Sequence, residues 1–305
     1  MLSYWAMKVL GSIVCLLPDF MCRLFAKGLG EFAWLVVPAW RKYMAAENIK
    51  DCLGVDQKRA DEIAKESVTR FGRMIVEVLR FPLLNKDNFR RIVKFEGLEY
   101  LEAAFRAHKG VVMATAHYGN WEMLGGSLAL LGYPILSITR KQNNGGMDKF
   151  INDYRMMLGQ QVAYNHGGNS MLAIGHILKA KNLVGILYDQ DTGRDGEHLT
   201  FFGKPSVVPQ GAAFLSRMFG APIIPLFIHN NPDGTMTTKI YPPLYTPKTT
   251  NRNADVSGIM KELVVIVEQE IVRDPAMWFW VHDRWKDGRG KYKKFKEGKS
   301  PNDNK

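Results

Sequence analysis

Short apolar runs alternate with helical segments along most of this 305-residue chain, and this alternation constrains the fold more than any other feature. The runs 111–117, 183–188 and 223–228 have the length and apolar character of buried strands. Segments such as 57–80 and 256–273 show the three-to-four-residue spacing of helices. Strands and helices that alternate in this way predict an α/β domain, with a largely parallel central sheet flanked by helices.

The same patterns set the expected element boundaries. Strands are expected at 93–96, 111–117, 134–139, 161–164, 183–188, 223–228 and 236–241. Helices are expected at 57–80, 98–108, 121–131, 148–158, 170–181, 212–219 and 256–273. The segment 93–96 is expected at a sheet edge, and 236–241 alternates like one strand of a hairpin.

One strand end carries a histidine. The apolar run from residue 111 ends on His117, Gly119 and Asn120 supply a turn, and Asn120 is a natural N-cap for the helix that follows. Open α/β sheets bind ligands at the carboxyl ends of their strands. Glu122, in the first helical turn, is expected to meet His117 across this corner. A carboxylate on one imidazole nitrogen would leave the other nitrogen free as a general base.

Two further strand ends are polar. Asp189 and Asp191 follow the run 183–188, and Arg140 follows the run 134–139. A charged loop is often simply solvated, and a lone histidine at a strand end can be structural. Three successive polar strand ends nevertheless favour one shared crevice at the carboxyl edge of the sheet.

Several common catalytic motifs are absent from the sequence. It contains no HExxH zinc helix, no GxSxG elbow and no glycine-rich phosphate loop, and the other histidines lack metal-ligand spacing. We therefore expect no metal site. With no serine or cysteine nucleophile nearby, His117 is expected to activate a hydroxyl of the substrate, and a histidine–carboxylate pair of this kind suits acyl transfer to an alcohol.

The charge balance indicates an anionic partner. The chain has 41 Lys and Arg against 30 Asp and Glu, a net charge of +11. Nucleic acid, acidic phospholipid and an acidic carrier protein all fit such a charge. No helix-turn-helix, zinc-finger or RNP-type pattern is present, so nucleic acid is the least supported of the three.

Residues 1–40 are unusually apolar. The stretch 2–17 carries a single charge, Lys8, and neither it nor 24–40 is a clean run of about 20 apolar residues. These stretches are either helices packed on the soluble core or a membrane-associated segment, and their tyrosine and tryptophans favour the membrane. We expect three regions: a membrane-associated helical segment 1–40, an α/β domain 41–290 and a basic tail 291–305. Three cysteines without metal spacing indicate a cytoplasmic location for the main domain.

The motifs resemble those of a known family. His117 and Glu122 are separated by four residues, the HX4E pattern of glycerolipid and lysophospholipid acyltransferases. The motifs that narrow the resemblance are Tyr188-Asp-Gln-Asp191, Thr200-Phe-Phe-Gly203, Gly220-Ala-Pro-Ile-Ile-Pro225 and Trp278-Phe-Trp-Val-His-Asp-Arg-Trp-Lys286. This ordered set is similar to that of the lipid A biosynthesis acyltransferases of Gram-negative bacteria, and the resemblance covers about residues 10–290. The Glu-Gly-Thr-Arg phosphate motif of the glycerol-3-phosphate branch is absent, which favours the lipid A branch.

The resemblance implies an acyltransferase at the cytoplasmic face of the inner membrane, with a membrane helix at its amino terminus. It implies acyl carrier protein as the donor and co-substrate, with no other cofactor. The acceptor would be an acyl-chain hydroxyl of a Kdo-bearing lipid A precursor. Another glycolipid or lysolipid acceptor, or a non-catalytic lipid-binding protein, remains an alternative.

The resemblance also suggests residue roles. Arg155 aligns with a family arginine and is the first expected donor to the oxyanion. The amides of Gly119 and Asn120 are the alternative donors. Asp189 and Asp191 are expected to orient the acceptor headgroup, and Arg140 is expected to contribute to substrate binding.

Overall fold

The computed structural model describes residues 1–107, 110–165, 168–191 and 196–285. The α-helices are α1 Leu2–Leu16, α2 Asp19–Val36, α3 Ala39–Leu53, α4 Gln57–Leu79, α5 Leu98–Arg106, α6 Trp121–Leu130, α7 Gly145–Met157, α8 Gly168–Lys179, α9 Gly211–Phe219 and α10 Arg252–Arg273. Single 3-10 turns are η1 Phe81–Leu83, η2 Phe89–Arg91 and η3 Pro275–Met277. The strands are β1 Val93–Glu96, β2 Val111–Thr115, β3 Ile135–Thr139, β4 Gln161–Tyr164, β5 Leu183–Leu187, β6 Glu197–Phe201, β7 Lys204–Val208, β8 Ile223–Asn230 and β9 Met236–Ile240.

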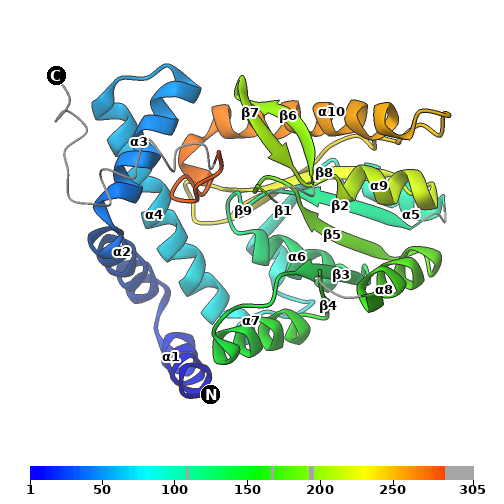
Figure 1. The fold of residues 1–305 in the computed structure, drawn as a ribbon. Coiled ribbons are helices and arrows are strands. Elements are labelled where there is room, and N and C mark those ends of the chain that lie inside the picture. Colours follow the sequence, from blue (N-terminus) through cyan, green and yellow to red (C-terminus); the bar gives the residue numbers. More distant parts are fainter. Residues whose placement is uncertain (108–109, 166–167, 192–195, 286–305) are drawn as a thin grey trace, which may run out of the picture.

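Seven strands form one sheet in the order β1-β9-β8-β2-β5-β3-β4 (Figure 1). Every neighbouring pair in it is parallel except β8 and β9, which pair antiparallel. The predicted largely parallel sheet is therefore confirmed, as are the edge position of β1 and the hairpin made by β9. The order also places β5 between β2 and β3, so the three polar strand ends lie on adjacent strands.

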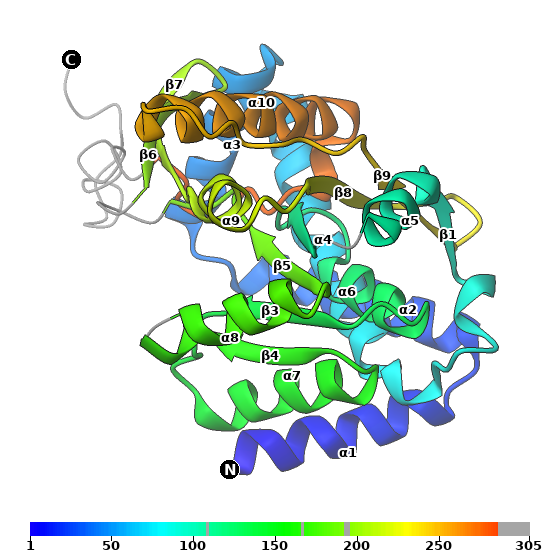
Figure 2. The same cartoon turned by 90° about the vertical axis from the view of Figure 1, so that its right-hand side faces the viewer.

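The sheet is covered on both faces. Along β2, Val112 and Ala114 belong to one buried cluster, whereas Val111 and Met113 belong to another. Successive strand residues point to opposite faces, so these two clusters are the two sides of the sheet. Helix α10 lies over one side, and α7 with α1 lies at the other (Figures 1 and 2). This arrangement explains why the predicted strands are apolar throughout.

Side chains fix where several helices begin. Asn120 accepts a hydrogen bond from the Met123 amide at the start of α6, as predicted. The helices α4, α7 and α10 start in the same way, with caps from Asp56, Asn144 and Asn251. An aspartate or asparagine at this position satisfies an amide that has no partner within the helix. The cap at Asn120 matters most for the site, because it sets the angle between β2 and α6.

Two features were not predicted. Strands β6 and β7 form a separate antiparallel hairpin around the Thr200–Gly203 turn. Phe202 and Gly203 both have positive φ there, 51° and 69°, which closes the turn within two residues. Helix α3 was also not predicted, although Gly54 ends it in the left-handed conformation.

The two amino-terminal helices pack through small residues. Gly11 and Val14 are the buried residues of α1, and Cys22, Ala26 and Gly30 are those of α2. A Cβ atom at Gly30 would lie 2.7 Å from the Thr69 carbonyl oxygen, so α2 and α4 approach too closely there for a larger residue. Within the described ranges, no helix combines the length and the apolar character needed to cross a membrane.

Candidate active site

Two neighbouring strands bring His117 and Asp189 together. Thr115 of β2 pairs with Leu187 of β5 in parallel register, and the Tyr188 amide donates to the Thr115 carbonyl at 3.1 Å. His117 and Asp189 each lie two residues beyond this pair, so they leave the sheet side by side. His117 Nδ1 lies 2.8 Å from Asp189 Oδ1. The structure therefore makes Asp189 the carboxylate that holds the imidazole.

Asp189 is enclosed and ionised. It is 1% exposed, and its second oxygen, Oδ2, accepts a hydrogen bond from the Trp278 indole at 2.8 Å. Burial alone would raise the pKa of Asp189, but the charge of His117 and the hydrogen bonds from His117 and Trp278 outweigh burial and lower it. The carboxylate is therefore charged at neutral pH and can only accept hydrogen bonds.

The protonation of the His117 ring follows from that contact. Because ionised Asp189 has no proton to give, Nδ1 must carry the hydrogen between them, and the neutral ring then has its lone pair on Nε2. Nε2 has no hydrogen-bond partner among the described residues. The side chain is 24% exposed, and its ring lies 5.0 Å from the Trp121 ring, edge to face. His117 thus holds an unprotonated nitrogen on an oriented ring whose side chain is partly exposed.

The expected contact between His117 and Glu122 is wrong. Glu122 accepts two hydrogen bonds from Arg155, at 2.7 Å from Nε and 2.5 Å from Nη2. Glu122 lies in the first turn of α6, where it faces α7, and the bidentate guanidinium fork takes both of its oxygens. Burial would lower the pKa of Arg155, but the charge and hydrogen bonds of Glu122 outweigh burial and raise it. This pair joins α6 to α7, and Arg155 also donates to Asn152.

The backbone amide of Gly119 is committed within the protein, whereas the expected role of the Asn120 amide stays a prediction. Gly119 donates its amide to the Met277 carbonyl at 2.9 Å, so the prediction that this amide serves an oxyanion is wrong. Gly119 has φ +60°, and a Cβ there would lie 2.2 Å from the Ile228 carbonyl oxygen. The Asn120 side chain caps α6 and donates from Nδ2 to Glu77 at 2.8 Å. Asn120 therefore shapes the turn from inside.

The remaining predicted residues lie at the expected strand ends. Arg140 follows β3 and is exposed, and Asp191 is half-buried two residues after Asp189. Their predicted roles toward substrate stay predictions.

The motif from Trp278 to Lys286 contains two basic residues, His282 and Arg284, for which the sequence predicted no role. Arg284 is 0% exposed and donates from Nη1 to the Val207 carbonyl at 3.0 Å. Burial lowers the pKa of Arg284, against the opposing charges of Asp189 and Asp191. Burial also lowers the pKa of His282, which the charge of Asp189 opposes. A sequence signal existed, because an arginine inside an aromatic-rich segment is a candidate for burial.

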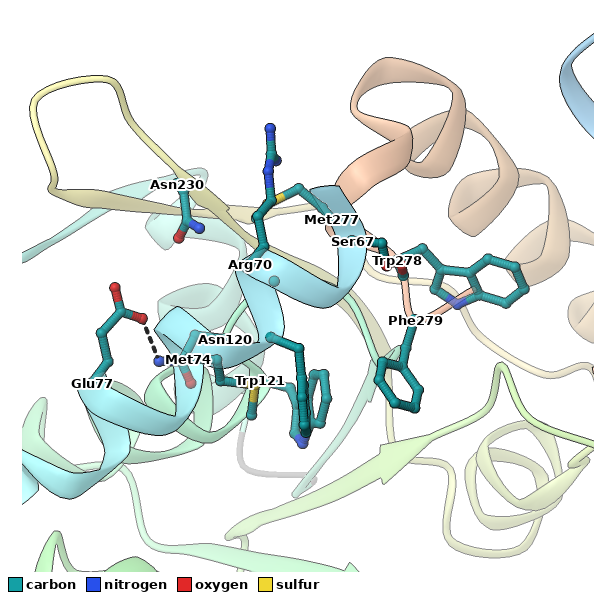
Figure 3. A pocket seen from close by; sticks show the side chains of 12 residues that line it. Ser67, Arg70, Met74, Glu77, Asn120, Trp121, Asn230, Met277, Trp278 and Phe279 are labelled. Atoms are coloured by element: carbon teal, nitrogen blue, oxygen red, sulfur yellow. Dashed lines mark hydrogen bonds between the residues drawn. The ribbon is translucent and has the colours of Figure 1, made fainter. Parts of the chain in front are cut away.

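A hollow lies behind the turn, between α4 and the segment after η3. Figure 3 shows Trp121, Phe279 and Met74 around it, with the Asn120–Glu77 hydrogen bond at one side. Burial raises the pKa of Glu77, although Arg73 and Asn120 oppose the shift. The turn after β2 is therefore held to α4 by the hydrogen bond between Asn120 and Glu77.

A histidine–carboxylate pair at the carboxyl edge of a largely parallel α/β sheet fits an enzyme that transfers protons, and acyltransferases are one such class. Sequence comparison agrees with this class. A sequence model described as bacterial lipid A biosynthesis acyltransferase matches residues 1–287, and the chain belongs to this family.

Curated relatives are similar over most of their length. A phosphatidylinositol mannoside acyltransferase of Mycobacterium tuberculosis strain H37Rv is 28% identical, over 92% of this chain and 88% of its own. A lipid A biosynthesis palmitoleoyltransferase of Escherichia coli K12 is also 28% identical, over 81% of this chain and 79% of its own. A lipid A biosynthesis acyltransferase of Haemophilus influenzae is 24% identical, over 93% of this chain and 91% of its own.

Proposed function

We propose that this acyltransferase moves a fatty acyl group from an acyl carrier protein thioester to a hydroxyl of a membrane glycolipid, with His117 as the general base. The observation that carries the proposal is the contact between His117 Nδ1 and buried Asp189, which leaves the Nε2 lone pair unused in a side chain that is 24% exposed. A base in this position can take a proton from a hydroxyl group.

The proposed step is balanced in atoms and charge. The acceptor hydroxyl gives its proton to His117 Nε2 while its oxygen attacks the thioester carbonyl carbon. The tetrahedral intermediate then collapses, the carbon–sulfur bond breaks, and the departing thiolate takes the proton back from the imidazolium. Asp189 stabilises that imidazolium through Nδ1. The step uses no metal and no nucleotide. A role for Arg155 toward the oxyanion stays a prediction, since its contacts are Glu122 and Asn152.

The acceptor is proposed to be a lipid A precursor, as the sequence motifs suggested. A second acceptor class has its own support, because mycobacterial phosphatidylinositol mannoside acyltransferases match this chain over 92% of its length. Lipid A and phosphatidylinositol mannoside are both glycolipids, so a sugar-bearing lipid is the common element. For the donor, the net charge of +11 favours an acidic carrier protein.

We further propose that α1 and α2 attach the enzyme to the cytoplasmic face of the inner membrane without crossing it. Their small residues face the protein, whereas large apolar side chains point outward, with Leu2 87% and Leu16 85% exposed. The other exposed apolar residues of these helices are Trp5, Val9, Ile13, Phe20, Met21, Leu24, Phe32, Leu35 and Val36. Exposed apolar surface of this extent is typical of interfacial helices.

Vesicle sedimentation tests this attachment. The full chain should pellet with vesicles of phosphatidylethanolamine and phosphatidylglycerol, and a Leu16→Asp/Leu24→Asp variant should stay largely in solution. Both positions are exposed, so the variant should keep the melting temperature of the unchanged protein. Equal pelleting of both proteins would show that these helices do not form the attachment surface.

The catalytic proposal is tested with purified protein and a panel of substrates. Acyl carrier protein and coenzyme A thioesters serve as donors, and a Kdo-bearing lipid A precursor, a mannosylated phosphatidylinositol and a lysophospholipid serve as acceptors. We expect thioester consumption only when a glycolipid is present, with none by His117→Ala. Consumption with the lysophospholipid alone would replace the glycolipid proposal. Binding of lipid without thioester consumption would identify a non-catalytic lipid-binding protein. Normal transfer by folded His117→Ala would overturn the mechanism.

A further inference from the structure

The indole of Trp278 completes the contacts of the Asp189 carboxylate. His117 Nδ1 lies 2.8 Å from Oδ1, and Trp278 Nε1 donates to Oδ2 at 2.8 Å. A carboxylate held by one oxygen alone can rotate about the bond to its Cβ. With both oxygens held from different directions, the plane of the Asp189 carboxylate is set, and so is the direction in which it meets His117.

The main chain of the same segment holds the other member of the pair. Met277 accepts the Gly119 amide at 2.9 Å, and Tyr118 forms an antiparallel bridge with Trp278. Tyr118 is the residue directly after His117. The segment therefore contacts the turn after β2 through its backbone and the end of β5 through its indole. One short piece of chain sets the relative position of two strand ends.

Trp278 is itself rigidly placed. It is 3% exposed, its ring lies 4.7 Å from that of Trp280 at a steep angle, and 5.6 Å from that of Phe201. Its carbonyl accepts a hydrogen bond from Ser67 Oγ of α4 at 2.5 Å. Figure 3 shows Ser67 next to Trp278 at the edge of the hollow. The indole N–H cannot leave Asp189 without disturbing this packing.

We infer that Trp278 is a positioning residue for acyl transfer, which acts by holding the Asp189 carboxylate in the orientation that keeps the His117 ring ready as a base. This inference rests on the proposed function. It adds a residue that neither the HX4E spacing nor the strand-end pattern indicated, and this residue acts through Asp189.

The test variant is Trp278→Phe in the full chain, which keeps an aromatic ring and removes the N–H. Loss of a hydrogen bond to a charged group should lower kcat by about 10-fold to 100-fold, with KM unchanged. Without the indole hydrogen bond, the pKa of Asp189 should rise. A more basic carboxylate stabilises the protonated form of its partner, so the acid limb of the pH–rate profile should move to higher pH. His282 and Arg284 also interact electrostatically with Asp189, and both are unchanged in the variant.

Trp280→Phe is the matched control. Its indole donates at 2.7 Å to the Pro275 carbonyl, so it loses a buried hydrogen bond of the same segment without touching Asp189. We expect a lower melting temperature for this control, with kcat and the acid limb close to those of the unchanged enzyme. If Trp278→Phe does not fold, a 3-benzothienylalanine side chain at position 278 keeps the bicyclic shape and lacks only the N–H.

The outcomes separate the two proposals. An N–H-deficient variant with the kcat and pH profile of the control would overturn the inference about Trp278 and leave the base role of His117 standing. Full transfer by folded His117→Ala would remove the proposed mechanism and, with it, any role for Trp278 in that mechanism. A drop in kcat with an unmoved acid limb would show a structural effect only and would also overturn the inference.

Discussion

Two carboxylates flank the turn after β2, and each is paired with a basic side chain, but the two pairs differ in kind. Asp189 holds His117, an imidazole with one nitrogen that carries a hydrogen and a second that can accept a proton. Glu122 holds Arg155, whose guanidinium stays charged at neutral pH. Only the first pair can move a proton. An ion pair that lies close to the proposed base is therefore not by itself part of the catalytic pair.

Their places in the fold differ in the same way. Asp189 leaves the end of β5, beside the end of β2, at the edge where α/β sheets bind ligands. Glu122 and Arg155 belong to helices α6 and α7, and their contact joins these helices. We therefore expect the first pair to control the rate and the second pair to control stability.

The largest effect is expected at Asp189. Asp189→Asn keeps the size of the side chain, but its amide can donate a hydrogen to Nδ1 and favour the tautomer with the proton on Nε2. A base in the wrong tautomer should lower kcat by about 10⁴-fold. Steady-state acyl transfer measures this loss, and circular dichroism checks that the variant is folded. A folded Asp189→Asn enzyme with more than a tenth of the normal kcat would break the distinction between the pairs.

Glu122→Gln should affect mainly stability. It leaves the Arg155 guanidinium without its counter-charge, and removing one partner of a buried pair costs about 3 kcal/mol, at the low end of the usual range because both side chains retain some exposure. Urea unfolding measures the change, with kcat reduced far less than by Asp189→Asn.

The matched control for that measurement is the double variant Glu122→Gln/Arg155→Gln, which removes both charges. It should recover part of the lost free energy of unfolding, because no uncompensated charge remains. A Glu122→Gln protein with normal stability but no transfer would instead return Glu122 to the catalytic pair.

Most of the fold was predictable from local pattern. Strand β1 and strand β4 match the predicted ranges in full, and a glycine marks one end of each, Gly97 after β1 and Gly159 before β4. The hairpin β6–β7 was missed, since its strands carry many polar residues and its turn depends on a positive φ at Phe202. Apolar and polar residues alternate over only a few positions in these strands, which is too short a pattern to predict a strand. Packing of β6 against α10 therefore decides their conformation.

The site was predicted in its members but not in its pairing. His117 and Asp189 were both singled out because each follows an apolar strand. Which acid meets the histidine depends on strand order, and the sequence does not reveal that β5 lies next to β2. Glu122 was favoured because it is near in sequence. The contact with Asp189 spans 72 residues and follows from the sheet register, which local patterns do not contain.

Glu270 of α10 is a buried carboxylate outside the site, and its charge is expected to affect the stability of the fold in acid. It is 1% exposed, accepts hydrogen bonds from Tyr241 and Lys239, and lies 2.8 Å from His229 Nε2. Burial would raise the pKa of Glu270, but the hydrogen bonds from His229, Tyr241 and Lys239 outweigh burial and lower it to about 2.

The sign of the pH effect follows from that shift. A carboxyl whose folded pKa is about 2, below its ordinary value of 4.5, stabilises the protein above pH 4.5 and loses this contribution as the pH falls toward 2. We expect Glu270→Gln to lower the free energy of unfolding by about 2 kcal/mol at pH 7, and by progressively less toward pH 2. Urea unfolding at several pH values measures this, with Glu268→Gln on the same helix as the control, because burial raises the pKa of Glu268 instead. A loss that stays constant from pH 7 to pH 3 would mean that Glu270 stabilises the fold by packing and not by its charge.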